Sequence, residues 1–171
     1  DVERSRGLGD VYKRQLHQLK AQEGNNGAPL ITISTRCDED GGNKRVQVIH
    51  TGDTRTSGKG VIIDNLPLAD FEDEWIQVET EMHYTHHGTF RIKLTRISDG
   101  KVLADQSFAD IDLWRKGATS IRNKFGIYRS LGRKMQSASD RPDNGLKDES
   151  LQLADFKVYE AHTNPNPQPH D

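Results

Sequence analysis

Short runs of alternating apolar and polar residues fill the chain from Leu16 onward. Such runs are typical of half-buried strands, because successive side chains on a strand point to opposite faces. Turn-forming residues separate the runs at intervals of about 8–12 residues, which favours an antiparallel β-sandwich or jelly roll. The pattern predicts about nine strands: Leu16–Ala21, Pro29–Arg36, Arg45–His50, Gly60–Asp64, Trp75–Tyr84, Phe90–Thr95, Lys101–Phe108, Lys124–Arg129 and Ser150–Tyr159.

Almost no helix is expected. The sequence predicts an irregular segment or one helical turn over Leu66–Glu74, and one helical turn over Ile111–Gly117. We therefore expect a single all-β domain over residues 16–161, followed by a disordered proline-rich tail at 162–171. Residues 1–15 lack either periodicity and resemble a translated sequencing adaptor, so we set them aside as non-native or disordered. On that interpretation, N-terminal strands and a signal peptide are missing.

The predicted strand Lys124–Arg129 has two chemically different faces. Phe125 and Ile127 share an apolar face that we expect to enter the core. Lys124, Gly126 and Tyr128 share the other face, which offers a cation, a gap without a side chain and a phenol. A polymer could lie close to the backbone on such a face.

The first predicted strand carries a similar division. If Leu19 faces the core, Gln18 and Lys20 point outward together. The amide of glutamine can hydrogen-bond a carboxylate or a hydroxyl, and lysine supplies a cation. By itself this strand could equally be a solvated surface.

Composition narrows the function classes. The apolar fraction of 32% fits a thin sandwich with a wet groove, or an incomplete domain. A net charge of -2 leaves no overall basic field for nucleic acid. Cys37 is the single cysteine, which excludes an internal disulfide and a cysteine-based zinc site. No apolar run approaches the roughly 18–20 residues that would span a membrane.

Histidine and acidic residues give weaker signals. His83, His86 and His87 surround a predicted hairpin turn, where an exposed loop is favoured over a metal site. Glu79 and Glu81 share a strand face about 7 Å apart, so they could form the carboxylate pair of a glycoside hydrolase or simply line a groove. The acidic turn at 38–40 could hold a structural Ca²⁺ weakly.

Two short motifs together resemble polysaccharide lyases of the concanavalin-like jelly-roll type. The run Lys124-Phe125-Gly126-Ile127-Tyr128 is similar to the Lys-Ala-Gly-x-Tyr strand of alginate lyases, and its ending is more like the heparin-lyase and glucuronan-lyase branches. Gln18-Leu19-Lys20 is similar to the Gln-x-His strand, with lysine in place of histidine. An upstream arginine-bearing strand of that family is missing here. The resemblance also includes the Trp75 strand, the Trp114–Gly117 turn and the Ala154–Phe156 segment.

The resemblance implies β-elimination on a uronate-containing polysaccharide. Gln18 and Lys124 would neutralise the uronate carboxylate, and Tyr128 would be the acid. The base is left open between Tyr128 and Lys20. Gly126 would let the sugar chain approach the sheet. Further groove-lining residues would be Arg129, His83, Glu79 and Glu81.

The same resemblance implies a secreted monomer that acts on an acidic polysaccharide, with no required cofactor and no nucleic-acid or membrane partner. Two other classes stay open at this point. One is a non-catalytic carbohydrate-binding jelly roll that uses the same groove. The other is a glycoside hydrolase that uses Glu79 and Glu81.

Overall fold

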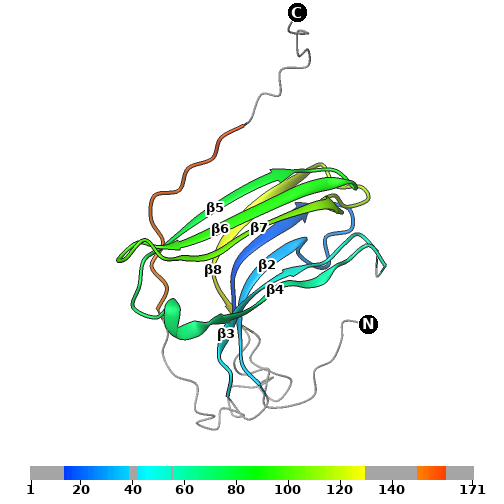
Figure 1. The fold of residues 1–171 in the computed structure, drawn as a ribbon. Coiled ribbons are helices and arrows are strands. Elements are labelled where there is room, and N and C mark those ends of the chain that lie inside the picture. The colour runs from blue at the N-terminus through cyan, green and yellow to red at the C-terminus, as the bar shows by residue number, and fades with distance from the viewer. Residues whose placement is uncertain (1–13, 39–41, 55, 130–149, 161–171) are drawn as a thin grey trace, which may run out of the picture.

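The computed structural model describes residues 14–38, 42–54, 56–129 and 150–160. Within them, eight strands form two antiparallel sheets that pack face to face as a β-sandwich (Figure 1). The five-stranded sheet has the order β4-β3-β2-β1-β8, and the three-stranded sheet has the order β5-β6-β7. The strands are β1 (Arg14–Gln22), β2 (Ile31–Arg36), β3 (Arg45–His50), β4 (Gly60–Pro67), β5 (Ile76–His83), β6 (Gly88–Arg96), β7 (Val102–Ile111) and β8 (Ser120–Arg129). The prediction of an all-β sandwich is confirmed.

The core lies between the two sheets and follows the alternation in the sequence. In β6, the central strand of its sheet, Phe90, Ile92 and Leu94 are at most 1% exposed. Leu19 and Val48 face them from the five-stranded sheet and are fully buried. Burial of these side chains is the main favourable contribution to folding. The remaining buried apolar residues of this core are Leu30, Ile31, Ile33, Val46, Ile63, Ala104, Ile111 and Leu113.

The predicted strand Arg45–His50 has the bounds that the sequence indicated, and several others are longer than expected. Strand β1 begins at Arg14, so Arg14 and Gln15 belong to the sheet although the sequence pattern set them aside. The expectations for the earlier N-terminal segment and for the tail at 162–171 lie outside the described residues.

Two predicted elements are wrong. No helical turn forms over Ile111–Gly117, because Ile111 and Leu113 both enter the core and the Leu113 amide donates to the Thr85 carbonyl. The predicted closing strand Ser150–Tyr159 is also absent, since residues 150–160 form neither a strand nor a hydrogen bond to other described residues. The one described helix is the 3-10 turn η2 (Leu68–Asp70). No helix in the described part of the chain is long and apolar enough to cross a membrane.

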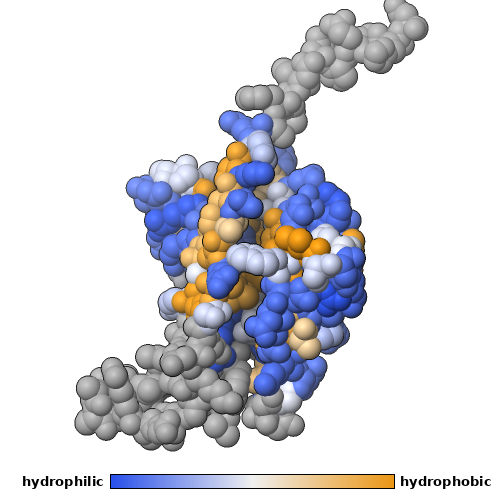
Figure 2. Space-filling view, turned by 90° about the vertical axis from the view of Figure 1, so that its left-hand side faces the viewer, coloured by the Kyte–Doolittle hydropathy of each residue, from blue (hydrophilic) through white to orange (hydrophobic). Residues whose placement is uncertain are grey.

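The apolar face of β8 is not buried as predicted. Phe125 is 50% exposed and Ile127 is 39% exposed. Among the described strands, β8 ends the five-stranded sheet and has a neighbour on one side only. The Phe125 ring contacts His17 on one side and Phe156 of the C-terminal segment on the other, each at 4.7 Å between ring centroids. Figure 2 shows apolar surface running between hydrophilic flanks on one side of the molecule. Within the described part of the chain, the core is therefore left partly open beside β8.

Candidate functional site

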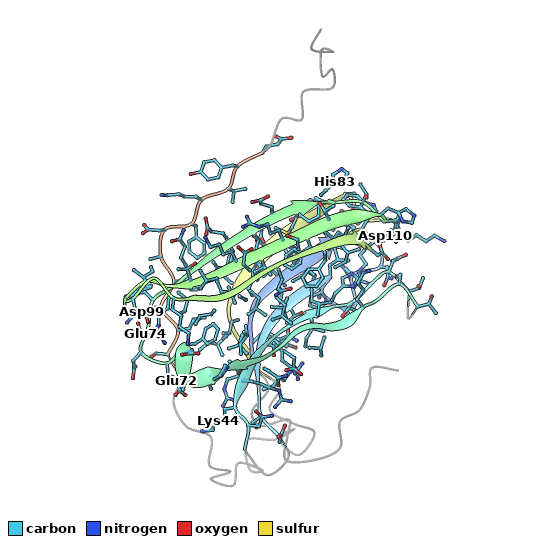
Figure 3. All side chains as sticks on the ribbon, viewed as in Figure 1. Lys44, Glu72, Glu74, His83, Asp99 and Asp110 are labelled. Atoms are coloured by element: carbon cyan, nitrogen blue, oxygen red, sulfur yellow. The ribbon has the colours of Figure 1, made fainter. Side chains whose placement is uncertain are left out.

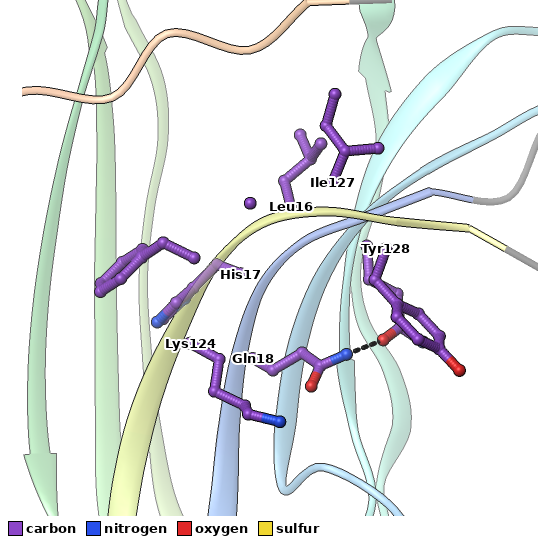
Figure 4. Close-up of a pocket in the computed structure, with 9 residues that line it drawn as sticks. Leu16, His17, Gln18, Lys124, Ile127 and Tyr128 are labelled. Carbon is purple, nitrogen blue, oxygen red and sulfur yellow. Dashed lines mark hydrogen bonds between the residues drawn. The ribbon is translucent and has the colours of Figure 1, made fainter.

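Strands β1 and β8 lie side by side and bring the two sequence motifs together. Gln18 pairs with Lys124 across the two strands, and Gln15 pairs with Tyr128. The side chains of Gln18, Lys124 and Tyr128 extend from the same side of the two strands (Figure 4). The prediction that Lys124 and Tyr128 share a face agrees with this arrangement, and the pairing adds the Gln18 amide to them.

An open depression of about 190 Å³ lies where the regular pairing of these strands is interrupted. The register shifts between Gln15 and His17, which leaves Leu16 on one strand facing Gly126 and Ile127 on the other. Irregularities of this kind redirect side chains and are frequent beside functional sites. The depression is lined by Gln15, Leu16, His17, Gln18, Lys124, Phe125, Gly126, Ile127 and Tyr128.

Gly126 is required for its backbone conformation. Its φ of +133° lies in a region that other residues rarely adopt, and a Cβ added there would meet no atom within 4 Å. Lack of room for a side chain is therefore not the reason for glycine at this position. Glycine is needed because the interrupted pairing imposes a positive φ, and the same interruption shapes the depression.

Gln15 is a site residue that sequence reasoning missed. The Gln18 amide nitrogen donates a hydrogen bond to the Gln15 side-chain oxygen, which orients the Gln18 amide beside Lys124 (Figure 4). Gln15 was set aside with the N-terminal segment, since residues 1–15 lack alternation. Its pairing with Tyr128 and its hydrogen bond with Gln18, which no local pattern in the sequence shows, place it at the site.

Lys20 is not among the residues that line the depression. It pairs with Arg122 and stands two positions beyond Gln18 on the same face of β1, or about 7 Å at the usual strand rise. Arg129 pairs with Arg14 through the backbone at the end of β8, and its side chain lies outside the described part of the structure.

Glu79, Glu81 and His83 lie on β5 in the other sheet, and the structure does not bring them to Tyr128. Glu81 forms an ion pair of 2.9 Å with Arg91 on the outer face of that sheet. His83 stands near the turn whose Thr85 accepts a hydrogen bond from Leu113, at the end of the sandwich where β8 begins (Figure 3). Tyr128 lies near the opposite end of β8. The predicted groove-lining role of these three residues therefore has no geometric support here.

His17 lies beneath the depression, on the inner side of β1. It is 8% exposed, it stacks on Phe125, and its Nε2 lies 3.0 Å from the Asn123 side-chain oxygen. Burial lowers the pKa of His17, and the contact with Asn123 offsets this only in part. Because it faces inward, His17 does not replace the histidine that the Gln-x-His motif lacks here.

A second polar cluster lies at the end of the sandwich where β7 leaves its sheet. The carboxylate of Asp112 is 2.8 Å from His86 Nδ1 and accepts a hydrogen bond of 2.9 Å from the Asp53 amide. Burial alone would raise the pKa of Asp112, but hydrogen bonds from Ser57, the Asp53 amide and His86 together lower it. His87 pairs with Asp110 at 2.7 Å on the surface. The cluster joins loops at this end of the sandwich.

His50 also belongs to this cluster, because its ring hydrogen-bonds the backbone of Asp112. Its Nδ1 accepts a hydrogen bond from the Lys59 amide, so its Nε2 carries the proton and donates to the Asp112 carbonyl at 2.8 Å. Burial lowers the pKa of His50 from its usual value of 6.5. The neutral ring is thus the form that the fold accommodates.

We expect the free energy of unfolding to fall as the pH drops from about 7 to about 5. His17 and His50 have lowered pKa values in the folded protein, so the unfolded chain takes up protons first below 6.5. Their full contribution is present above that pH and is lost as the pH falls toward the folded pKa values. Urea unfolding at the two pH values measures the change. His17→Phe should reduce the loss, while the same change at exposed His83 should not; equal stability at both pH values would contradict the expectation.

No metal centre is indicated. Among the described residues, no group of three or more histidine, cysteine, aspartate or glutamate side chains could hold a metal ion. Of the acidic turn considered for Ca²⁺, only Asp38 is described, and it accepts a hydrogen bond of 2.8 Å from Arg45.

Comparisons with protein-family models, with curated proteins and with solved structures find no match for this chain.

Proposed function

We propose that this protein cleaves a uronate-containing polysaccharide by β-elimination. The observation that carries the proposal is the gathering of Gln18, Lys124 and Tyr128 on one side of β1 and β8, around an open depression. An amide and an ammonium can neutralise the uronate carboxylate, and a phenol can move the proton. The short resemblance of these two strands to lyase motifs supports the same chemistry.

The first requirement is to make the C5 proton of the uronate acidic. Gln18 and Lys124 donate hydrogen bonds to the neighbouring carboxylate, which stabilises the negative charge that develops when C5 loses its proton. Gln15 holds the Gln18 amide through the hydrogen bond between their side chains. The second amide hydrogen of Gln18 stays available for the substrate.

The second requirement is a group that moves the proton. We assign this step to Tyr128, because Lys20 lies outside the depression. The phenolate takes the proton from C5, the electron pair forms the C4–C5 double bond, and the C4–O4 bond breaks. The phenol then returns the proton to O4 of the leaving sugar, so that Tyr128 ends as it began. Tyr128 is 66% exposed, which leaves its hydroxyl open to a polymer.

The two other classes find less support in the structure. A carbohydrate-binding module would be expected to present several aromatic rings to the sugar. Phe125 and Tyr128 do line the depression, but Trp75 and Trp114 do not. A hydrolase would use Glu79 and Glu81, but Glu81 is paired with Arg91 on the other sheet.

The test is near-ultraviolet absorbance of the unsaturated uronate product. The wild-type protein is incubated with glucuronan, alginate, pectate, heparin-type and hyaluronan-type polymers. We expect absorbance to rise on at least one polymer, and we expect Glu81→Gln to retain that activity. A flat trace on every polymer from folded protein would contradict the proposal, and release of reducing sugar that depends on Glu81 would favour the hydrolase.

A further inference from the structure

Next to the depression, the outer face of β1 and β8 carries three cations side by side. Lys20 is directly opposite Arg122, and Lys124 follows Arg122 by two positions on the same face. Residues two apart on a strand are separated by about 7 Å, and directly opposite residues are closer still. We call Lys20, Arg122 and Lys124 the cationic strip.

Like charges directly opposite each other on paired strands destabilise a sheet. The nearest positions on this face do not relieve the repulsion, because Gln18, Gln22 and Ser120 are all neutral. None of the ion pairs among the described residues involves a member of the strip. The strip is therefore a concentration of positive charge without an internal counterion in the described part of the chain.

Arg122 differs from the other arginines whose side chains the structure describes. Arg45, Arg91 and Arg96 form ion pairs with carboxylates, and Arg115 donates to buried carbonyls. Arg14 and Arg36 also have partners. Among these described side chains, the Arg122 guanidinium alone has no hydrogen bond or ion pair. Its five donors are exposed and directed away from the core, where a planar acidic group could bind to two of them.

We propose that Lys20 and Arg122 of the cationic strip bind a second acidic group of the substrate, on the sugar unit next to the one whose carboxylate is held by Gln18 and Lys124. This inference rests on the proposed function for the position of the first unit. The polymer would then run along β8 from Tyr128 toward Arg122. The chemical class of the polymer follows from this arrangement. The substrate carries a carboxylate or a sulfate on successive sugar units, because a polymer with widely spaced acidic groups would leave the strip unoccupied.

The test is binding, measured by affinity electrophoresis and calorimetry at low and high salt. The ligands are polyglucuronate for carboxylate, dextran sulfate for sulfate, and glucuronic acid as a single unit. Arg122→Gln is compared with Lys93→Gln, which removes one positive charge from the other sheet. We expect Arg122→Gln to weaken polyglucuronate binding about tenfold at low salt and to reduce its salt dependence. Binding of the single unit should not change.

The outcomes separate this inference from the proposed function. Loss of binding in Arg122→Gln together with a flat absorbance trace in the wild type would support the strip and contradict the lyase. Product formation with equal binding by Arg122→Gln and Lys93→Gln would contradict the strip and leave the lyase standing. Weakened binding of dextran sulfate as well would extend the strip to sulfate. A wild-type protein that binds neither polymer at low salt would overturn the inference.

Discussion

Replacing Tyr128 with phenylalanine is expected to lower kcat for uronate-polymer cleavage by about 10²–10⁴-fold. The phenol hydroxyl is the one group that we assign to both proton transfers, and the substitution removes it while keeping the ring. Because Tyr128 is 66% exposed and pairs with Gln15 through the backbone, stability should change by less than about 0.5 kcal/mol. Initial rates of absorbance increase measure the activity, and urea unfolding checks the fold.

Tyr159→Phe is the matched control for this experiment. It removes the same hydroxyl from a tyrosine that is 83% exposed on the segment 150–160, and it should keep wild-type activity. If Tyr128→Phe retained most of the wild-type rate, the proton would be moved by another group, and the assignment of Tyr128 would be wrong. KM should change much less than kcat, since the carboxylate is held by Gln18 and Lys124.

Replacing Arg115 with methionine is expected to lower the free energy of unfolding by about 3–5 kcal/mol. The Arg115 side chain is 3% exposed and donates hydrogen bonds to the carbonyls of Ala28, Pro29, Thr51 and Gly52. These carbonyls belong to two loops at the end of the sandwich. Methionine has a similar length but no donors, so it would leave buried carbonyl groups without partners.

The Arg115 guanidinium is itself a buried charge. Burial lowers the pKa of Arg115, and the nearby carboxylates of Asp53 and Asp112 oppose that change. Chemical denaturation of Arg115→Met measures the loss. Arg122→Met is the control, because Arg122 is exposed and has no hydrogen-bond or ion-pair partner among the described residues. Arg115→Lys should lie between the two, since it keeps the charge but offers fewer donors. A loss below about 1 kcal/mol in Arg115→Met would show that the loops hold their shape without it.

Part of the strand pattern was predictable from residue type and local alternation, as in β6, where Phe90, Ile92 and Leu94 are buried in turn. Arg45–His50 was predicted with its observed bounds because Val46, Val48 and Ile49 favour a strand, although its burial does not alternate. The segment after Ile111 was predicted wrongly as a helical turn, because its local pattern does not show that Arg115 reaches the carbonyls of two distant loops. Ser150–Tyr159 alternates like a strand, yet alternation alone cannot supply a neighbouring strand for it to pair with.

The same division holds for the site. Period-2 geometry by itself predicted that Gln18 and Lys20 share a face of their strand and that Lys124 and Tyr128 share a face of theirs, because side chains alternate along a regular strand. Only the tertiary structure decided that β1 pairs with β8, that the register shift opens a depression, and that Lys20 faces Arg122 in place of Tyr128. Pairing between strands about a hundred residues apart depends on how all the strands pack together, which no local pattern encodes.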